Sequence, residues 1–205
     1  MTRPRFHRLS AEQQAAILDA ALTEFSTHGY RDASLNRIID SAGISKGSMY
    51  YYFDDKEDLY AHVIRRQLEA LVQQGGPIPV PDAQHPDAFW ATLADHYLTL
   101  MRMLAATPET AALLRGWLVG PAAPALRDAQ QDAEQAMLPW LMSTVEAGQQ
   151  VGAIRTDLPV DLILAVAMGM GQAMDVWLIT QPPSDTDLGV WTRTLIDTMR
   201  RALQP

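Results

Sequence analysis

The sequence predicts an all-α fold of about nine helices, for three reasons. Apolar residues recur at every third or fourth position along most of the chain, and no stretch alternates apolar and polar residues over the length of a strand. Capping residues precede these apolar runs, and glycine or proline follows them. The chain has 205 residues, enough for one large domain or two small ones with a real core.

The first helix is predicted to begin after Ser10. The pattern from Ser10 to Gln13 is a capping box, in which each of these two side chains can bond the other residue's backbone amide. Apolar residues then lie on one helical face from Leu18 to Phe25. Gly29 is expected to end this helix, because glycine is the usual residue just beyond a helix C-terminus.

Three further helices are expected before residue 75, at 35–41, 46–52 and 56–74. Ser34 and Ser45 can cap the first two, and Asp55 can cap the third. Glu57 and Asp58 then place acidic groups in a first helical turn, where the helix dipole favours them.

Residues 75–86 form the clear linker of the chain, because two glycines and four prolines interrupt the helical pattern there. Five helices are expected after it, at 87–106, 113–119, 125–151, 159–180 and 187–203. The expected domains are therefore residues 1–55, with an N-terminal arm and three helices, and residues 56–205. The helix at 56–74 would join the two.

Composition excludes several kinds of site. The chain has no cysteine, which rules out disulfides, thiolate metal sites and cysteine nucleophiles, and no metal or cofactor is predicted. No apolar segment follows the basic N-terminus, so no signal peptide is expected. The longest apolar stretch, 162–180, is interrupted by Gln172 and Asp175. It is interpreted as a buried helix and not a membrane span, in a cytoplasmic protein.

Charge is distributed unevenly. Residues 1–66 hold nine basic and nine acidic residues, whereas residues 67–205 carry the whole net charge of −8. Only the N-terminal part could approach a phosphate backbone. Its arm carries Arg3, Arg5 and Arg8 and no acid. These arginines form either a disordered tail or contacts to a minor groove or phosphates; the second is favoured because nothing acidic offsets them.

Residues 34–53 have the features of a helix-turn-helix. Two short helices are joined by Ala42-Gly43-Ile44, where small residues allow a close crossing and the glycine can take a positive φ. The second helix opens with Ser45-Lys46-Gly47-Ser48, which offers hydroxyls, a cation and an unobstructed backbone to DNA. Three tyrosines at 50–52 follow, each with a flat face for a thymine methyl and a hydroxyl for a phosphate.

Residues 17–59 resemble the DNA-binding domain of the TetR family. The matching pieces, at fixed spacing, are Ala20-Ala21, Phe25, Gly29-Tyr30, Ala42-Gly43-Ile44-Ser45, Lys46-Gly47-Ser48, Tyr50, Tyr52-Phe53, and Lys56-Glu57 before Leu59. The resemblance covers about the first third of the chain. It implies a three-helix DNA-binding domain, followed by a larger helical domain for effector binding and dimerisation.

The resemblance also implies roles at matching positions. Phosphate contacts are expected from Ser34, Ser48, Tyr50, Tyr52 and Lys56. Base contacts are expected from Lys46, Gly47 and Tyr51, with Asn36 or Arg37 reading from the preceding helix. Ser45, at the start of the recognition helix, is a further candidate DNA-binding residue. Tyr51 departs from the histidine that is frequent in the family. One of the three tyrosines could instead serve packing, and His62 is expected to face solvent.

The resemblance places an effector cavity among the middle helices. Large soft side chains and a few polar groups there are the candidates to line it: Trp90, His96, Tyr97, Met101, Arg115, Trp117, Met137, Trp140, Met170, Met174, Asp175 and Trp177. For each apolar residue, plain core packing is the competing interpretation. Asp175 lies in an otherwise apolar helix, where burying it unpaired would be costly; outward exposure is its alternative.

The helix at 159–180 carries small residues on one face. Ala165, Gly169 and Ala173 recur every fourth residue, and small side chains allow close helix approach. With the last helix of each chain, this face would form a four-helix bundle across a two-fold axis. Packing within the monomer is the alternative.

The function predicted from these observations is transcriptional repression. A homodimer would bind a palindromic operator in double-stranded DNA, and a small hydrophobic effector would release it. One alternative is a regulator or activator that binds DNA without an effector. The other is a helical enzyme, which is disfavoured because the sequence lacks a phosphate-binding glycine loop, an HExxH motif and a nucleophile elbow.

Overall fold

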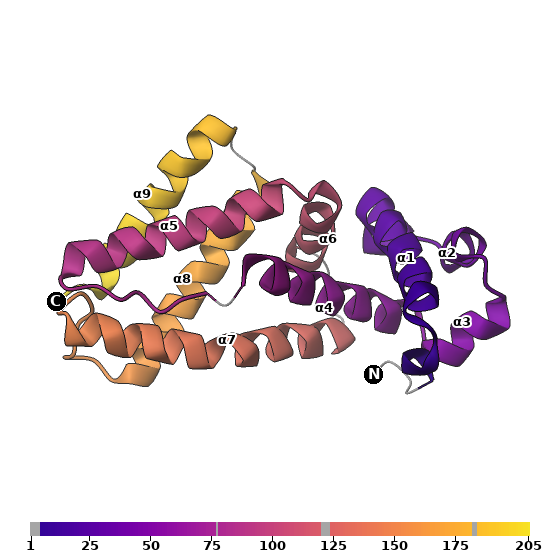
Figure 1. Ribbon diagram of the computed structural model, residues 1–205, viewed down its shortest axis with the longest axis horizontal. Helices are drawn as coiled ribbons and strands as arrows, with labels where there is room; N and C mark the ends of the chain where they lie inside the picture. Colours follow the sequence, from indigo (N-terminus) through magenta and orange to yellow (C-terminus); the bar gives the residue numbers. More distant parts are fainter. Residues whose placement is uncertain (1–4, 77, 120–123, 182–183) are drawn as a thin grey trace. The chain divides into compact units, whose positions relative to one another are not determined.

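The computed structural model describes residues 5–76, 78–119, 124–181 and 184–205. Over these residues the fold is all-α, as predicted, with no strand and nine α-helices after a short 3₁₀ turn (Figure 1). The elements are η1 (Phe6–Arg8), α1 (Ala11–Asp32), α2 (Leu35–Ala42), α3 (Lys46–Tyr52), α4 (Lys56–Gly75), α5 (Pro86–Ala105), α6 (Pro108–Val119), α7 (Pro124–Gln150), α8 (Val160–Thr180) and α9 (Asp185–Leu203).

Local signals fix most helix ends. Ser10 forms the predicted capping box, accepting from the Gln13 amide at 3.2 Å while the Gln13 side chain accepts from the Ser10 amide. Gly29 has a φ of 69° and interrupts α1 as predicted, although one more turn follows it to Asp32. The clearest difference is α6, which begins at Pro108 and not at 113, because a proline suits the first turn of a helix.

The described residues form two compact units. Unit 1 comprises residues up to 74 together with 107–133, and unit 2 comprises 75–106 together with 134–205. This division differs from the expected boundary at residue 55, since α4 and α6 complete the core of unit 1. The assignment of DNA binding and effector binding to the segments 1–55 and 56–205 stays a prediction.

Unit 1 is built around Tyr60 of α4. Its ring packs on Phe25 with a centroid distance of 4.7 Å, and its hydroxyl donates to the carbonyl of Leu113 on α6 at 3.2 Å. Further buried residues of α1, α2 and α3, among them Ile17, Ile38 and Met49, fill the same core. Burying these side chains stabilises the helices that carry the turn described below.

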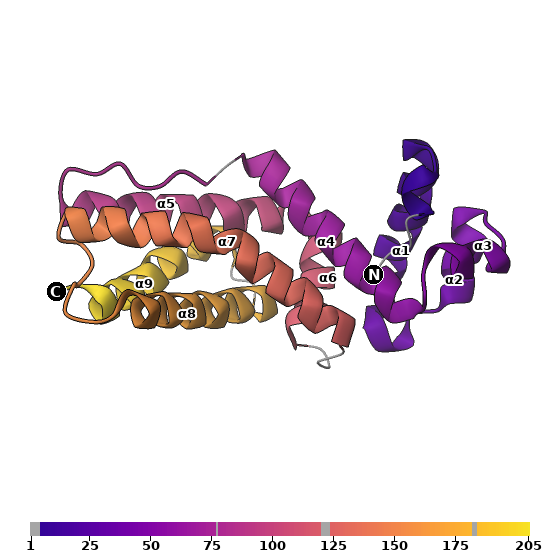
Figure 2. The ribbon, with the colours of Figure 1, turned by 90° about the horizontal axis from the view of Figure 1, so that it is seen from below.

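Unit 2 consists of α5, α8, α9 and the second half of α7. Figure 2 shows α8 and α9 side by side, and α9 also packs against α5. The indole of Trp90 lies in this core and donates to the carbonyl of Ala153 at 3.3 Å. At the surface, Arg200 of α9 pairs with Asp87 of α5 at 2.7 Å.

Helix α8 is less buried in the single chain than the sequence suggested. Among the described residues it is the one helix long and apolar enough to cross a membrane, and 28% of its most apolar window is buried. Core helices of soluble proteins have the same length and composition, so this helix does not indicate a membrane protein. The interpretation as a buried helix is wrong for its outer face, where Leu162 and Trp177 are exposed.

Candidate nucleic-acid interface

The turn between α2 and α3 has the predicted geometry. Gly43 takes a left-handed conformation with φ 65°, which a side chain would disfavour, and the amide of Ile44 donates to the carbonyl of Ile39 at 3.2 Å. Ile38 and Met49 are both buried, so α2 and α3 each hold one apolar side against the core of unit 1. The opposite side of α3 faces solvent.

Ser45 caps α3. Its hydroxyl oxygen accepts from the Ser48 amide at 3.0 Å and lies 2.8 Å from the Ser48 hydroxyl. The cap fixes where α3 begins and leaves Lys46 and Gly47, the next two residues, exposed.

Tyrosines on α3 divide between surface and interior. Tyr50 and Tyr51 are 44% and 47% exposed, whereas Tyr52 is half-buried with its ring edge towards Phe6. Asn36 is exposed on α2. Asn36 and Tyr51, two of the residues predicted to read bases, are thus exposed, and one of the three tyrosines takes part in packing, as one of the interpretations held.

Arg37 is exposed but is engaged in an ion pair with Glu24. Its Nε donates to Glu24 Oε1 at 2.9 Å, and Nη2 donates to the carbonyl of Asp32 at 2.9 Å. Glu24 also accepts from the Ser34 amide at 2.7 Å. The Arg37 hydrogen bond holds the pKa of Glu24 below its usual value, against the opposing effect of burial. This pair fastens the start of α2 to α1.

Lys56 is engaged as well. Its ammonium donates to the carbonyls of Arg31 and Ala33 at 3.0 and 3.1 Å and lies 4.9 Å from the centre of the Tyr30 ring. It therefore satisfies carbonyls at the C-terminal end of α1, where a cation also complements the helix dipole. The resemblance predicts that Lys56 binds a phosphate, but in the free protein its ammonium donates to these two carbonyls instead.

The N-terminal arm folds back onto the helix-turn-helix. Phe6 is fully buried, with ring centroids 5.0 Å from Phe53 and 5.2 Å from His62. The expectation that His62 faces solvent holds only in part, because its side chain is half-buried against Phe6 and Phe53. Burial, with help from the nearby His7, lowers the pKa of His62 to about 4.

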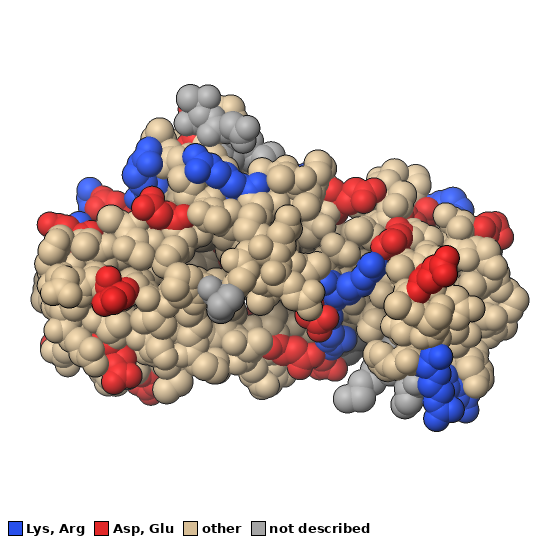
Figure 3. All heavy atoms as spheres, viewed as in Figure 1, with Lys and Arg blue, Asp and Glu red and all other residues tan. Residues whose placement is uncertain are grey.

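Arg5 lies directly before this anchor. Its guanidinium carbon is 4.4 Å from the centroid of the Tyr51 ring, a cation–π distance. Figure 3 shows Lys and Arg side chains gathered over η1 and α3 on the face displayed. From Arg5 to Arg8 the arm thus packs against the helix-turn-helix, and Arg3 lies outside the described residues.

Two polar residues predicted for the effector site meet in unit 2. The hydroxyl of Tyr97 on α5 donates to Asp175 Oδ1 on α8 at 2.7 Å. Burial raises the pKa of Asp175 to about 6, although the Tyr97 hydrogen bond acts in the opposite direction. His96 is half-buried, and its Nδ1 has no hydrogen-bond partner among the described residues.

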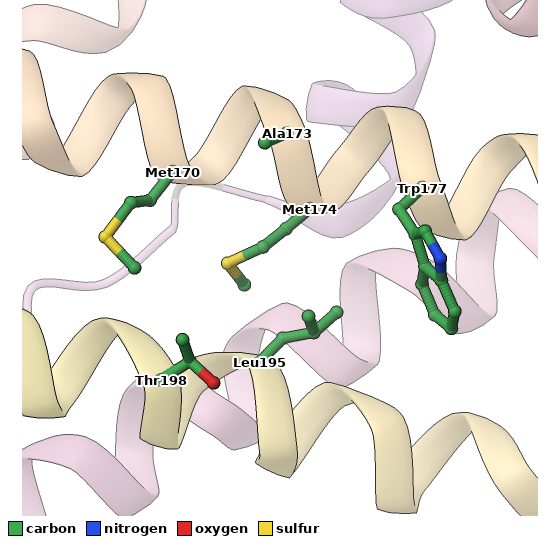
Figure 4. Close-up of a pocket in the computed structure, with 6 residues that line it drawn as sticks. All are labelled: Met170, Ala173, Met174, Trp177, Leu195 and Thr198. Atoms are coloured by element: carbon green, nitrogen blue, oxygen red, sulfur yellow. The ribbon is translucent and has the colours of Figure 1, made fainter.

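A pocket of about 230 Å³ lies between α8 and α9 (Figure 4). Three predicted effector residues of α8 line it, namely Met170, Met174 and Trp177, and Leu195 and Thr198 of α9 complete it with Ala173. The lining is almost wholly apolar.

The remaining predicted effector residues do not gather at that pocket. Trp90 and Met101 are core residues, and Trp140 donates to the carbonyl of Pro79 at 3.4 Å. Met137 is 39% exposed on α7. Arg115 and Trp117 belong to α6, within unit 1, because α6 packs on α1.

The three small residues predicted for the dimer interface, Ala165, Gly169 and Ala173, are exposed on α8. A methyl group added at Gly169 would meet no atom within 4 Å. Nearby, Trp177 and Trp191 of α9 stack with centroids 5.0 Å apart, although they are 37% and 42% exposed. The α8–α9 face of the single chain is thus apolar and open.

Residues 17–63 match the family model for bacterial regulatory proteins of the tetR family. The chain carries a TetR-family DNA-binding domain. The match includes the whole of the helix-turn-helix and the first part of α4, so the resemblance noted in the sequence is confirmed over this segment.

Relatives agree with the match. The regulator RutR of Escherichia coli K12 is 43% identical over 68 residues, which span 33% of this chain and 32% of RutR. The chain thus matches about a third of the length of RutR. The repressor AcnR of Corynebacterium glutamicum is 26% identical over 72% of this chain and 71% of its own.

Solved structures extend the likeness to the whole fold. The Bacillus subtilis regulator FadR, in complex with stearoyl-CoA, has a TM-score of 0.70 at 19% identity, covering 92% of this chain and 98% of that one. SmeT, the repressor of a Stenotrophomonas maltophilia multidrug efflux pump, has a TM-score of 0.69 at 17% identity, over 98% and 93% of the two chains. The chain has the fold of TetR-family regulators.

Two residues that support the helix-turn-helix, Glu24 and Phe6, were not identified from the sequence. Glu24 was not singled out, because nothing local marks a helical glutamate as the partner of an arginine thirteen residues away. Phe6 offered a signal, since it is an isolated aromatic residue in a basic arm and such a residue needs a partner to be buried.

Proposed function

We propose that the chain is a cytoplasmic transcriptional repressor that binds palindromic operator DNA as a homodimer and is released by a small apolar effector. The observation that carries the proposal is the outward surface of α3, where Lys46, Gly47, Tyr50 and Tyr51 are exposed beside a capped helix N-terminus. A helix presented in this way can lie in the major groove of B-DNA.

Two kinds of contact would act on this surface. The cation of Lys46 and the hydroxyls of Tyr50 and Ser48 suit phosphate oxygens, which supply affinity but little sequence information. Tyr51 and the backbone at Gly47 suit base edges, and a tyrosine face packs well on a thymine methyl. Two copies in a dimer would read two half-sites about 34–36 Å apart.

DNA binding is tested by selecting bound fragments from a random-sequence pool and titrating the selected site with salt. We expect a palindromic site and a steep fall of affinity with salt. Lys46→Ala and Tyr51→Ala should each lose binding, whereas Arg193→Ala, which removes an exposed cation in unit 2, should not. Failure to enrich any sequence at low salt, with protein freed of small molecules, would contradict the proposal.

Effector binding is proposed for unit 2. Met170, Met174 and Trp177 provide adaptable apolar walls, and the Tyr97–Asp175 pair supplies a polar group inside the same unit. FadR, which shares the fold, is known in complex with stearoyl-CoA. An anionic head group would be repelled by the Asp175 carboxylate, so neutral or cationic apolar compounds are the better candidates here.

Release by an effector is tested with three octadecyl probes that differ in the head group: octadecylamine, octadecanol and stearoyl-CoA. Each is added to the complex of protein and selected DNA, and tryptophan fluorescence and DNA release are recorded together. We expect the amine or the alcohol to change both signals. If no member of this panel or of a wider apolar panel acts, the ligand-independent regulator is the better interpretation.

Dimerisation is proposed through α8 and α9. Ala165, Gly169 and Ala173 present little side chain, so a second copy could approach closely, and the Trp177–Trp191 pair would be covered. Sedimentation equilibrium should give a dimer for the natural sequence and a monomer for Gly169→Arg with Ala173→Arg. Ala91→Arg, an exposed position on α5, is the matched control and should remain dimeric. A dimeric double variant would place the interface elsewhere.

A further inference from the structure

Arg5 of the N-terminal arm lies on the surface proposed to bind DNA. Phe6 is buried among Phe53, Tyr52 and His62, so the chain on its N-terminal side must emerge beside α3. Arg5 takes this position, with its guanidinium 4.4 Å from the centre of the exposed Tyr51 ring. A buried aromatic anchor and a stacked cation thus hold the arm against the recognition helix.

Several cations of unit 1 are engaged in ion pairs or hydrogen bonds within that unit. Arg37 pairs with Glu24, Arg65 with Asp132 and Arg66 with Asp19. Lys56 closes the end of α1 through two carbonyls. Lys46 and Arg5 are different, since neither has an ion pair with any carboxylate of the described residues.

The contact with Tyr51 leaves the hydrogen-bonding capacity of Arg5 unused. A guanidinium carries five N–H donors, and the Arg5 side chain makes no hydrogen bond to any described residue while it lies over the Tyr51 ring. The donors therefore remain available for a phosphate, which an arginine can bind with two parallel hydrogen bonds. The stack also restricts the side chain before binding, which reduces the entropy lost on contact.

We propose that Arg5 is a DNA-binding residue that donates to the phosphate backbone bordering the groove that α3 enters, with Phe6 as the residue that positions it. The proposal rests on the function proposed above. It adds a contact from outside the TetR-family match, which begins at residue 17. Together with Lys46 it would supply the positive charge that Arg37 and Lys56 do not offer.

The salt dependence of binding to the selected operator tests the proposal. Each phosphate contact contributes about 0.9 to the slope of log K against log salt, so Arg5→Ala in both protomers should reduce the slope by about 1.8. The affinity lost relative to the natural sequence should then be about tenfold greater at 50 mM than at 200 mM salt. The loss should be similar on operator and unrelated DNA, because a phosphate carries no sequence information.

Three further variants separate the role of Arg5 from a structural one. Arg5→Lys keeps the charge and should keep the slope, whereas Arg193→Ala should leave both slope and affinity unchanged. Phe6→Leu, a conservative change in the anchor, should lower affinity without adding to the loss in Arg5→Ala. Circular dichroism should show that Arg5→Ala melts like the natural sequence.

Several results would overturn the proposal while leaving the proposed function intact. An unchanged slope in Arg5→Ala would mean that Arg5 touches no phosphate. A loss confined to one base position of the operator, with an unchanged slope, would make Arg5 a base reader. If the natural sequence itself binds no DNA at low salt, the proposed function fails and this inference fails with it.

Discussion

The hydroxyl of Tyr97 donates a 2.7 Å hydrogen bond to the carboxylate of Asp175 and so joins α5 to α8 inside unit 2. Among the described residues, Tyr97 is the side chain that donates a hydrogen bond to Asp175. A carboxylate on an otherwise apolar helix needs such a donor where it is shielded from water, because burying an unpaired charge is costly. The stability of unit 2 should therefore depend on both partners and on pH.

Tyr97→Phe should lower the free energy of unfolding by about 1–3 kcal/mol at pH 8, since it removes the donor and leaves the carboxylate. Asp175→Asn should have the opposite effect. The folded pKa of Asp175, about 6, is above its unfolded value of 3.8, so the folded state gains stability as pH falls through 6. The advantage of Asp175→Asn should be largest at pH 8 and shrink towards pH 5. Thermal melts at both pH values measure this, and a constant difference would contradict it.

Glu24→Gln should destabilise unit 1 by about 1–3 kcal/mol at pH 7, because a neutral amide replaces the charged acceptor of Arg37 and the Ser34 amide. The pKa of Glu24 is lowered in the folded state, so its contribution is present above the usual value of 4.5 and is lost as pH falls below it. Chemical denaturation at pH 7 gives the comparison. Asp40→Asn, at an exposed site on α2, is the control and should change stability little. Equal stability of Glu24→Gln and the natural sequence would rule out this role.

Mild acid should weaken unit 1 through His62. The pKa of His62 is about 4 in the folded state and 6.5 when unperturbed. Between these pH values His62 is therefore protonated in the unfolded chain and neutral in the folded chain. Between pH 6.5 and 4 the free energy of unfolding should therefore fall, although the nearby Asp58 carboxylate opposes this in part. His62→Gln should flatten that dependence. His85→Asn, which keeps a capping side chain at the start of α5, should not. Denaturation curves at several pH values decide, and parallel curves for all three proteins would refute the expectation.

Gly148→Ala should destabilise unit 2 by about 1–3 kcal/mol. The added methyl group would lie 2.7 Å from two side-chain carbons of Ile154 and 2.8 Å from Phe89, closer than carbon atoms approach without displacement. Gly171→Ala is the matched control on α8, where nothing lies within 4 Å, and it should be neutral or slightly stabilising. Thermal melts of the two variants test this, and equal melting temperatures would show that Ile154 can move aside.

Helix positions could be predicted because their signals are local. The Ser10 capping box, the stop at Gly29 and the start at Lys46 each depend on residues within one turn of the chain. The residues next to each helix boundary are therefore enough to predict where the helix begins or ends. The same holds for the turn at Gly43, which fixes the geometry of the helix-turn-helix.

Pairings between distant residues could not be predicted in this way. Tyr97 and Asp175 were each singled out, but 78 positions separate them and their contact depends on how α5 and α8 pack. Likewise, α6 was placed correctly as a helix, but its membership of unit 1 depends on the surface that Tyr60 offers it. Lys56 shows the same limit, since its family role is to bind phosphate and its contacts here are carbonyls 23 and 25 positions away.

The different surroundings of the two lysine side chains also affect how this protein would be modified covalently. The chain contains two lysines, Lys46 and Lys56, both within the TetR-family match. The Lys56 ammonium donates to two carbonyls, whereas Lys46 is exposed at the start of α3. Among side chains, acylating reagents or an acetyltransferase would therefore react first at the recognition helix. A single acetyl group there would remove a positive charge from the surface proposed to bind DNA, and under that proposal bound operator would protect Lys46 from the reagent.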